Sequence, residues 1–428
     1  MAARSLLIDL TPVRESRDFR RLWLSQLATG AGRQVVIVAL PYQVYVLTHS
    51  SLLVGLLGVV QAVPIVVAGL YGGALADRFD RRRLQLAAKT AVAAGSLALA
   101  LGAIGLRAPV GFVYAVVTIT AAASTVDQAS RTATVARLVP PGLLPSAMSL
   151  SQALFQGSAI VGPALAGLII ARAGLSWAYV ADVLAFAPAA LMVWRLSPQR
   201  PSGEHQVPIG WRAPLEAIRY VRRSRLVVGL FSADLVAMIF GMPTALFPAL
   251  ALSVFGIGAG GLGLLYAALA AGGLAGSLLS GWVRSIVRQG RAVFVAIAIL
   301  GLAITGFGLA GSRLWLSLPL LAVAGAGDLV SAIFRGTILQ VVVPDSMRGR
   351  MSAFHLMVVT TGPRLGDLEA GAVAALAGPI FSVVSGGIAC VAGIAVLAAL
   401  LPQMRRHRSA AAAPDRVRGL GSPTALSG

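Results

Sequence analysis

Twelve long apolar runs follow one another along the chain, separated by short polar or charged segments. A run of about 20 residues is long enough to cross the hydrocarbon core of a bilayer as a helix. Helices are expected because each segment must satisfy its own backbone hydrogen bonds in lipid. The runs cover residues 22–47, 52–76, 84–106, 112–138, 146–171, 177–196, 226–252, 261–283, 292–312, 314–340, 351–377 and 379–401.

The composition also indicates a membrane protein. Hydrophobic residues make up 57% of the 428 residues and charged residues only 12%, against about 25% in soluble domains. The mean hydropathy is +0.84. The first residues are mixed and polar, so no signal peptide is expected. The single cysteine, Cys390, excludes a disulfide framework.

The distribution of Lys and Arg predicts the orientation. With both termini cytoplasmic, 30 of the 35 basic residues fall in inner segments, and only Arg107, Arg172 and Arg313 fall in outer loops. This split predicts an even number of spans. We expect the membrane to be the cytoplasmic (inner) membrane of a bacterium. The net charge of +20 does not indicate nucleic-acid binding, because the basic residues are spread over every inner loop.

An internal repeat relates the two halves of the chain. Gly162-Pro163 in the fifth run recurs as Gly362-Pro363 in the eleventh, and Arg131 recurs as Arg335. Such a duplication predicts an all-α protein of two pseudo-symmetric six-helix halves, with a binding site between them at the bilayer midplane. The expected divisions are a cytoplasmic tail (1–21), a first bundle (22–196), a linker (197–225), a second bundle (226–401) and a disordered tail (402–428).

The end of the linker has an amphipathic pattern. Trp211, Leu215 and Ile218 fall on one helical face, and arginines occupy the others. We interpret this segment as a short helix lying on the inner leaflet. A plain connector with a basic flank explains the pattern equally well.

The loop after the second run carries a charged motif, which reads Gly73-Ala-Leu-Ala-Asp77-Arg78-Phe-Asp-Arg81-Arg82-Arg83. It resembles the G-x-x-x-D-R-x-G-R-R signature of the major facilitator superfamily, with Asp80 in place of the second glycine. The resemblance implies a conformational gate in which Asp77 meets the positive N-terminal end of the eleventh helix, expected near Met351. The gate residues are then Gly73, Asp77, Arg78, Arg81 and Arg82.

A closer resemblance extends over most of the chain. Leu6-Leu7-Ile8-Asp9, Gly72 to Arg78, Leu246 to Ala251 and Gly349-Arg350-Met351 are similar to segments of the enterobactin exporter group of that superfamily. The resemblance implies proton-driven export of a small molecule by a monomer, with a siderophore as the expected cargo. Neighbouring groups with the same pattern are drug efflux pumps, so broad-specificity efflux is the alternative.

The fifth run contains Gly157, Gly162, Pro163 and Gly167. This set approximates the glycine-proline signature of antiporters in the superfamily, although the spacing differs. Glycine permits close approach of helices, and proline permits a bend. A plain helix-packing role is the alternative.

Charged residues inside the runs are candidates for function, because each costs at least a few kcal/mol in lipid and normally faces a cavity or a partner. A buried carboxyl group can take up and release a proton during transport. We consider as coupling candidates Glu369, Asp367, Asp127, Asp234 and Asp328.

The spacing of these charges suggests local pairs. Arg364 and Asp367 lie three apart on one helical face and can neutralise each other. Glu369 is then unpaired and is the first choice for the coupling proton, with a role at the outer gate as the alternative.

Two more runs carry an acid and an arginine. Asp127 and Arg131 are four apart and can form an ion pair, whereas Asp328 and Arg335 are too far apart for direct local pairing. An alternative pairs these arginines with carboxylates of adjacent helices. Asp182 is expected to be a wetted residue at a helix end.

Arg33 lies about twelve residues into the first run with no acid nearby in sequence. Its guanidinium can bind an anionic or catechol-rich cargo through hydrogen bonds and cation-π contacts. Pairing with an acid across the bundle is the alternative. The other candidates for substrate binding are Arg364, Gln61 and Tyr42, of which Gln61 and Tyr42 can equally serve in helix packing.

Several other classes of protein are poorly supported. The sequence has no G-x-x-x-x-G-K-[ST] motif and a single lysine, so ATP-driven transport is not expected. Four scattered histidines and one cysteine form no metal-binding pattern, and no cofactor is expected. A membrane enzyme or a sensor is the remote alternative, but no reactive cluster or sizeable soluble domain supports it.

Overall fold

The computed structural model describes residues 9–104, 108–199, 212–278 and 286–406, and every regular element within these ranges is a helix. The predicted tail after residue 406 and most of the polar linker lie outside the described residues. The long helices are α2 (Arg17–Thr48), α3 (Ser51–Arg78), α4 (Arg81–Ala103), α5 (Val110–Leu138), α6 (Leu144–Ala173), α7 (Leu175–Trp194), α9 (Arg225–Phe240), α11 (Gly258–Leu278), α12 (Gln289–Leu309), α13 (Leu314–Val342), α14 (Asp345–Ala377) and α15 (Pro379–Leu400). The short ones are α1 (Thr11–Glu15), α8 (Arg212–Arg223), α10 (Phe247–Ala249) and α16 (Pro402–Arg406).

Ten helical segments in the described residues are long and apolar enough to cross a membrane. They match ten of the twelve predicted runs. The first and eleventh runs correspond to α2 and α14, which are 32 and 33 residues long but lack an equally apolar window. The physical reason is that these two helices carry charged residues in their middle parts, among them Arg33, Arg364 and Asp367.

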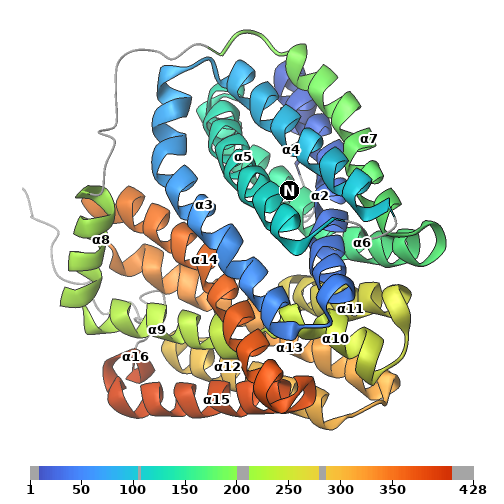
Figure 1. Ribbon diagram of the computed structural model, residues 1–428. Coiled ribbons are helices and arrows are strands. Elements are labelled where there is room, and N and C mark those ends of the chain that lie inside the picture. The colour runs from blue at the N-terminus through green and yellow to red at the C-terminus, as the bar shows by residue number, and fades with distance from the viewer. Residues whose placement is uncertain (1–8, 105–107, 200–211, 279–285, 407–428) are drawn as a thin grey trace, which may run out of the picture.

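The helices pack as two groups (Figure 1). In the upper group α2 packs on α6 and α7. Helices α4 and α5 pack on each other; α4 also packs on α7, and α5 also packs on α3. In the lower group α13 packs on α11 and α12, α12 on α15, and α14 on α9 and α15. Two helix pairs, α3 with α14 and α6 with α11, make the main contacts between the groups.

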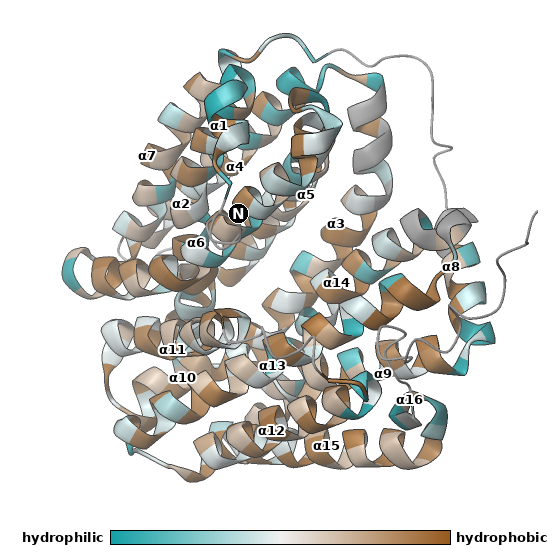
Figure 2. Cartoon of the chain, turned by 180° about the vertical axis from the view of Figure 1, so that it is seen from behind, coloured by the Kyte–Doolittle hydropathy of each residue, from teal (hydrophilic) through white to brown (hydrophobic). Residues whose placement is uncertain are grey.

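Small residues hold these two pairs together. A side chain at Gly55 of α3 would overlap the backbone carbonyl oxygen of Asp367 in α14. A Cβ on Gly167 of α6 would lie 2.9 Å from Cα of Gly263 in α11. Tyr45 Oη and Ser253 Oγ form a further hydrogen bond between the groups, 2.7 Å long. All these contacts lie toward the predicted outer ends, and Figures 1 and 2 show α3 and α14 diverging away from them.

The predicted seventh span is not one continuous α-helix. α9 ends at Phe240, and after a bend at Gly241 to Pro243 the chain continues as a 3₁₀ turn, α10 and a π turn to Val254. Proline lacks the amide hydrogen that an uninterrupted helix needs, so Pro243 and Pro248 account for the break. The break leaves the backbone amide of Ala245 free to donate a hydrogen bond to Asp367.

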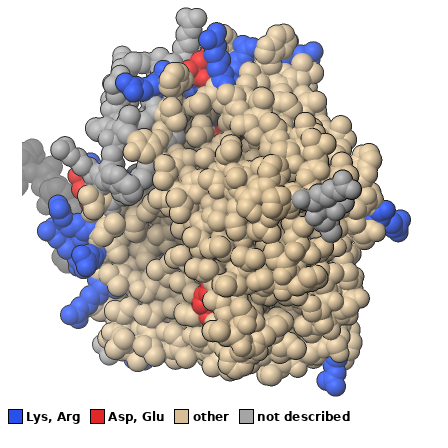
Figure 3. Space-filling model, in the orientation of Figure 1, with Lys and Arg blue, Asp and Glu red and all other residues tan. Residues whose placement is uncertain are grey.

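The molecular surface fits a membrane protein. Figure 2 shows apolar residues along the outer sides of many helices, with hydrophilic residues at helix ends and on α8. Figure 3 shows the middle of one face almost free of charged residues, with Lys and Arg gathered mainly along its upper and left margins. This asymmetry agrees with the sidedness expected from the loop charges.

Helix α8 forms where the linker was predicted to end in a helix. Its Ala217 is buried, while Leu215 and Arg219 are exposed. Glu216 forms an ion pair of 2.9 Å with Arg350 of α14, which attaches α8 to that helix. Its position on the inner leaflet stays a prediction.

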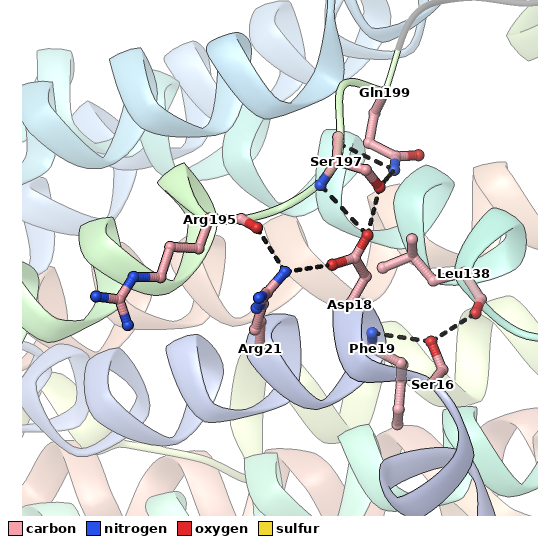
Figure 4. Close-up of polar contacts among 8 residues, drawn as sticks. All are labelled: Ser16, Asp18, Phe19, Arg21, Leu138, Arg195, Ser197 and Gln199. Carbon is pink, nitrogen blue, oxygen red and sulfur yellow. Dashed lines mark hydrogen bonds and ion pairs between the residues drawn. The ribbon is translucent and has the colours of Figure 1, made fainter.

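Hydrogen bonds join the start of α2 to the ends of two other helices (Figure 4). Ser16 caps α2 by accepting from the amide of Phe19, and it donates to the carbonyl oxygen of Leu138 at the end of α5. Asp18 accepts from Arg21 and from the amide and hydroxyl of Ser197, just after α7. These polar contacts therefore connect the helix ends that are predicted to be the inner ends of the first bundle.

We expect Gly55→Ala to separate the outer ends of the two helix groups by about 1–2 Å, because helix spacing depends on the side chains at the contact. Gly69→Ala in the same helix is the control, since a methyl there meets only Thr125 at 3.9 Å. Double electron–electron resonance between spin labels at Phe112 and Trp315, with Cys390 replaced by Ala, measures the separation. Equal distances in both variants would contradict this account.

Asp18 lies before the first predicted span and gives a pH-dependent contribution to stability. Partial burial raises the pKa of Asp18, but hydrogen bonds from Ser197 and Arg21 outweigh it and hold the pKa below its ordinary value. A depressed pKa stabilises the fold above the unfolded-state pKa and loses this effect as pH falls through the folded-state pKa.

Asp18→Asn should therefore lower the free energy of unfolding near pH 7 by about 1 kcal/mol or less, given that the site is partly solvent-exposed. The difference from the wild type should shrink as pH falls below about 4. Thermal unfolding in detergent across this pH range measures it. Glu15→Gln, an exposed substitution in α1, is the control and should leave the melting temperature unchanged at each pH.

Candidate functional site

A group of charged side chains lies between the two helix bundles. Arg33, in the middle of α2, has an exposed side chain. The charges acting on its guanidinium come from three other helices and belong to Arg131, Asp127, Arg364 and Asp182. Because these helices surround Arg33, its exposure is toward the interior of the molecule. Both basic and acidic groups therefore act on the guanidinium of Arg33.

Lys89 supplies an ion-pair partner that the sequence did not suggest. It lies two turns into α4, is buried, and places Nζ 3.2 Å from Oδ2 of Asp127 in α5. The predicted local pair of Asp127 with Arg131 is therefore not the recorded one. Lys89 lies inside the third predicted run, and its helical spacing from Gln85 offered a signal, because Gln85 also turns inward and donates to Thr134 of α5.

Asp182 corrects a second expectation. It was predicted to be wetted at a helix end, but it is buried in α7 and accepts a hydrogen bond of 2.7 Å from Ser96 of α4. Gly32 of α2 leaves the room that it occupies, since a Cβ there would lie 2.7 Å from Oδ1 of Asp182. The carboxylate thus connects three helices of the first bundle.

The predicted pair on α14 is present. Arg364 Nη1 lies 3.6 Å from Oδ2 of Asp367. The other carboxylate oxygen of Asp367 accepts from Thr244 Oγ1 at 3.0 Å and from the amide of Ala245 at 3.2 Å. Glu369, two residues on, is partly buried, and no hydrogen bond or ion pair is recorded for it within the described part of the chain.

A second ion cluster lies inside the C-terminal bundle. Arg335 Nη2 is 2.8 Å from Oδ1 of Asp234 and 3.9 Å from Oδ1 of Asp328. The expectation that Asp328 and Arg335 are too far apart for direct contact was wrong, because the long arginine side chain reaches back along α13. The contact of Arg335 with Asp234 matches the alternative prediction, in which this arginine pairs with a carboxylate of an adjacent helix.

Sequence reasoning missed His355 of α14. Its Nδ1 lies 4.0 Å from Oδ2 of Asp234. It lines a small cleft with Asp234 and Arg335 and with three apolar residues, Leu230, Phe231 and Leu339. The three polar residues come from different helices, so spacing in the sequence gave no signal for this cluster.

The remaining candidates for substrate binding have quieter surroundings. Tyr42 is partly buried and packs against the hydrophobic core. Gln61 is also partly buried, and no hydrogen bond is recorded for it among the described residues. Both roles stay predictions.

The gate motif is described only in part. The surroundings of the Gly73 and Asp77 side chains lie outside what the structure describes. Arg78 is exposed at the end of α3, and Arg81 donates to the carbonyl oxygen of Ala133 at 3.2 Å. The helix expected to begin near Met351 begins at Asp345 instead, because Pro344 sets its start.

Asp80, the departure from the superfamily signature, has a structural role. Its carboxylate caps α4 by accepting from the amide of Arg82 at 2.9 Å. The same oxygen accepts from the amide of Gln199 at 3.2 Å, and Arg81 donates its amide to the carbonyl oxygen of Gln199. The loop is thereby bonded to the beginning of the linker.

The glycine-proline set in α6 divides into packing and open positions. A side chain at Gly162 would overlap Cβ of Gln34 in α2, and Gly167 lies at the contact with α11. Pro163 is buried inside the helix. Gly157 meets nothing within 4 Å. The packing alternative therefore accounts for Gly162 and Gly167, whereas the antiporter role of the set is still a prediction.

No group of three or more His, Cys, Asp or Glu side chains in the described ranges is placed to hold a metal ion. Several charged side chains of the central region form ion pairs or hydrogen bonds, among them Asp127, Asp182 and Asp367. A guanidinium exposed between two bundles suits the binding of an anionic group.

Comparison with known proteins supports a transporter. Residues 8–418 match the family described as transmembrane secretion effector. The enterobactin exporter EntS of Citrobacter koseri is 27% identical over 97% of this chain and 99% of that protein.

Solved structures show the same fold at low identity. A POT family transporter in complex with 5-aminolevulinic acid has a TM-score of 0.72 and 11% identity, covering 91% of this chain and 97% of that one. A bacterial homologue of the iron transporter ferroportin, in an inward-facing state, has a TM-score of 0.68 and 15% identity, covering 91% and 98%. The chain therefore belongs to the transmembrane secretion effector family of the major facilitator superfamily, whose members are membrane transporters and not enzymes.

Proposed function

We propose that this protein exports a small anionic or catechol-rich molecule, of the enterobactin type of siderophore, by proton antiport with alternating access. The observation that carries the proposal is the end-to-end match to enterobactin exporters, which covers 97% of this chain. The exposed guanidinium of Arg33 between the bundles supports the cargo class.

The proposal includes twelve spans, with α2 and α14 crossing the membrane together with the ten apolar segments. Both helices pack between others of their bundles, so their charged residues avoid lipid. Twelve crossings put both termini on the same side of the membrane, and we propose that this side is the cytoplasm of a bacterial cell, because the loop charges favour it. We also propose that the protein lies in the inner membrane and acts as a monomer.

The positions of the contacts between the two halves support alternating access. The glycine contacts and the hydrogen bond from Tyr45 to Ser253 lie toward the predicted outer ends, so the conformation described is closed to the outside. Export requires these contacts to open as the inner ends close, and the motif from Gly73 to Arg82 is the proposed inner gate. We keep the glycine-proline set of α6 as part of the antiporter proposal.

Cargo binding is proposed for the region around Arg33 and Arg364. Planar guanidinium groups bind carboxylates through paired hydrogen bonds and stack on aromatic rings, which suits a catecholate. Gln61 and Tyr42 are proposed to contribute polar contacts from α3 and α2.

The geometry divides the proton-coupling candidates. Asp127 is balanced by Lys89, and Asp367 by Arg364 and two hydrogen bonds. Within the described part of the chain Glu369 makes no hydrogen bond or ion pair, and Asp234 and Asp328 share a single arginine. In a medium of low dielectric constant, an acid without a balancing charge is stabilised most when it takes up a proton. This favours Glu369, Asp234 and Asp328 as the proton carriers.

Arg33→Gln should abolish most enterobactin transport in proteoliposomes, because the amide keeps the shape of the site but removes the cation. Arg20→Gln, an exposed arginine at the start of the same helix, is the control and should transport like the wild type. In cells, deletion of the gene should reduce siderophore in the culture fluid under iron starvation.

Two outcomes would contradict the cargo proposal. One is full transport by Arg33→Gln. The other is undiminished siderophore secretion by the deletion strain together with new sensitivity to unrelated drugs, which would favour broad-specificity efflux.

Glu369→Gln should lose most pH-gradient-driven uptake into proteoliposomes while still binding cargo, because glutamine cannot carry a proton. Binding by isothermal titration calorimetry and uptake under an imposed pH gradient separate the two effects. Glu15→Gln serves as the matched control outside the predicted spans. Gradient-driven uptake at the wild-type rate would remove Glu369 from the coupling path.

A further inference from the structure

The ion cluster formed by Asp234, Asp328, Arg335 and His355 has an unbalanced charge. Two carboxylates face one guanidinium, so with a neutral imidazole the cluster carries one excess negative charge. An uncompensated charge in a protein interior is costly unless it is paired. One more positive charge is needed to neutralise the cluster.

The cluster also has unfilled hydrogen-bonding capacity. Asp234 and Arg335 are 1% and 3% exposed. Within the described residues, neither carboxylate oxygen of Asp234 makes a hydrogen bond of good geometry, and neither does Nε of Arg335. Buried polar atoms in this condition are exceptional and point to a missing partner.

His355 is the member of the cluster that can supply both the charge and the hydrogen bond. Its side chain is 32% exposed, whereas that of Asp234 is 2% exposed, so water reaches the imidazole but not the carboxylate. The Nδ1 atom faces Oδ2 of Asp234 at 4.0 Å, which a small rotation shortens to a hydrogen bond. Histidine is the side chain that ordinarily gains a proton between about pH 5 and 8.

We propose that this cluster is a binding site for one coupling proton, which the imidazole of His355 takes up from water and shares with Asp234. The proposal rests on the proton antiport inferred above and assigns the proton a place in the C-terminal bundle. The step breaks no covalent bond in the protein: a hydronium ion from the aqueous side donates a proton to the imidazole and becomes water, and the imidazolium N–H then donates a hydrogen bond to the carboxylate. The cluster becomes electrically neutral.

Among the residues that the structure describes on the neighbouring helices, no further cation approaches the two carboxylates. Asp234 faces His355 from α9, and Arg335 and Asp328 lie nearby on α13. Cys390 of α15 is close enough to feel the charges of Asp328 and Arg335. Arg335 already approaches both carboxylates. The second positive charge must therefore come from solution.

Protonation would tighten the contact of α14 with α9. With a neutral imidazole, the cluster joins α9 to α13 through Asp234 and Arg335, whereas a charged imidazole adds an ion pair between α9 and α14. His355 is nine residues before Arg364, about 14 Å along the same helix, and α14 is the main contact with α3. A proton at His355 thus acts on the helix that joins the two halves.

The test measures whether protons move α14 relative to the other half. Spin labels at Phe79, at the end of α3, and Val341, at the end of α13, report the separation of the inner ends in the purified full-length protein with Cys390 replaced by Ala. Lowering the pH from about 8 to about 6 should shift the distance distribution. His355→Gln should remove this shift, and His49→Gln, an exposed histidine at the opposite ends of the helices, should retain it.

A second variant guards against a folding defect in His355→Gln. Asp328→Asn removes the excess negative charge without touching the imidazole, so it should also weaken the shift. ¹⁵N-histidine NMR follows the same event directly, because the chain has four histidines and the signal absent from His355→Gln identifies His355. That signal should change with pH in the wild type and change less in Asp328→Asn.

Three outcomes would overturn the proposal: no pH-dependent shift in the wild type, an unchanged shift in His355→Gln, or an equal shift when sodium replaces potassium at constant pH. The last outcome would identify a sodium ion as the missing charge. None of these measurements uses a cargo. A failure of enterobactin transport would therefore remove the proposed function and leave this result standing, and the reverse also holds.

Discussion

The cost of placing charge inside a membrane-spanning helix constrains the whole structure. An isolated ion in hydrocarbon is so unfavourable that each charged side chain must find a partner, face water or exchange protons. Lys89 with Asp127, Arg335 with Asp234 and Arg364 with Asp367 satisfy this requirement between or within helices. Each of these pairs turns particular helix faces inward, so the charges also help to specify the arrangement of both bundles.

The opposite requirement holds where the bundles touch. At those places the helices need no charge and little side chain, and glycine on both partners brings backbone against backbone, as for Gly167 and Gly263. Contacts of this kind contain few specific hydrogen bonds and rely on close packing. They suit an interface that must separate and reform, whereas the ion pairs suit bundles that move as units.

The sequence was sufficient for the helices but not for the partners across them. Long apolar runs have one physical solution in lipid, and so ten segments appear where they were predicted. The pair of Arg364 with Asp367 was predictable because helical geometry brings residues three apart together. Asp182 with Ser96, and His355 with Asp234, join residues 86 and more than 100 positions apart, and only the packing of the bundles brings them into contact. Asp328 was misjudged for a different reason, since Cα spacing along a helix neglects the reach of an arginine side chain.

The break in the chain after α9 restricts how α14 can move. The freed amide of Ala245 and the hydroxyl of Thr244 both donate hydrogen bonds to Asp367, so α14 cannot slide along its own axis without losing these two bonds. It can still turn about this point. The arm from Asp367 to the start of the helix at Asp345 is about 33 Å long, so a rotation of about 10° carries its far end by about 6 Å while the residues next to Asp367 scarcely move.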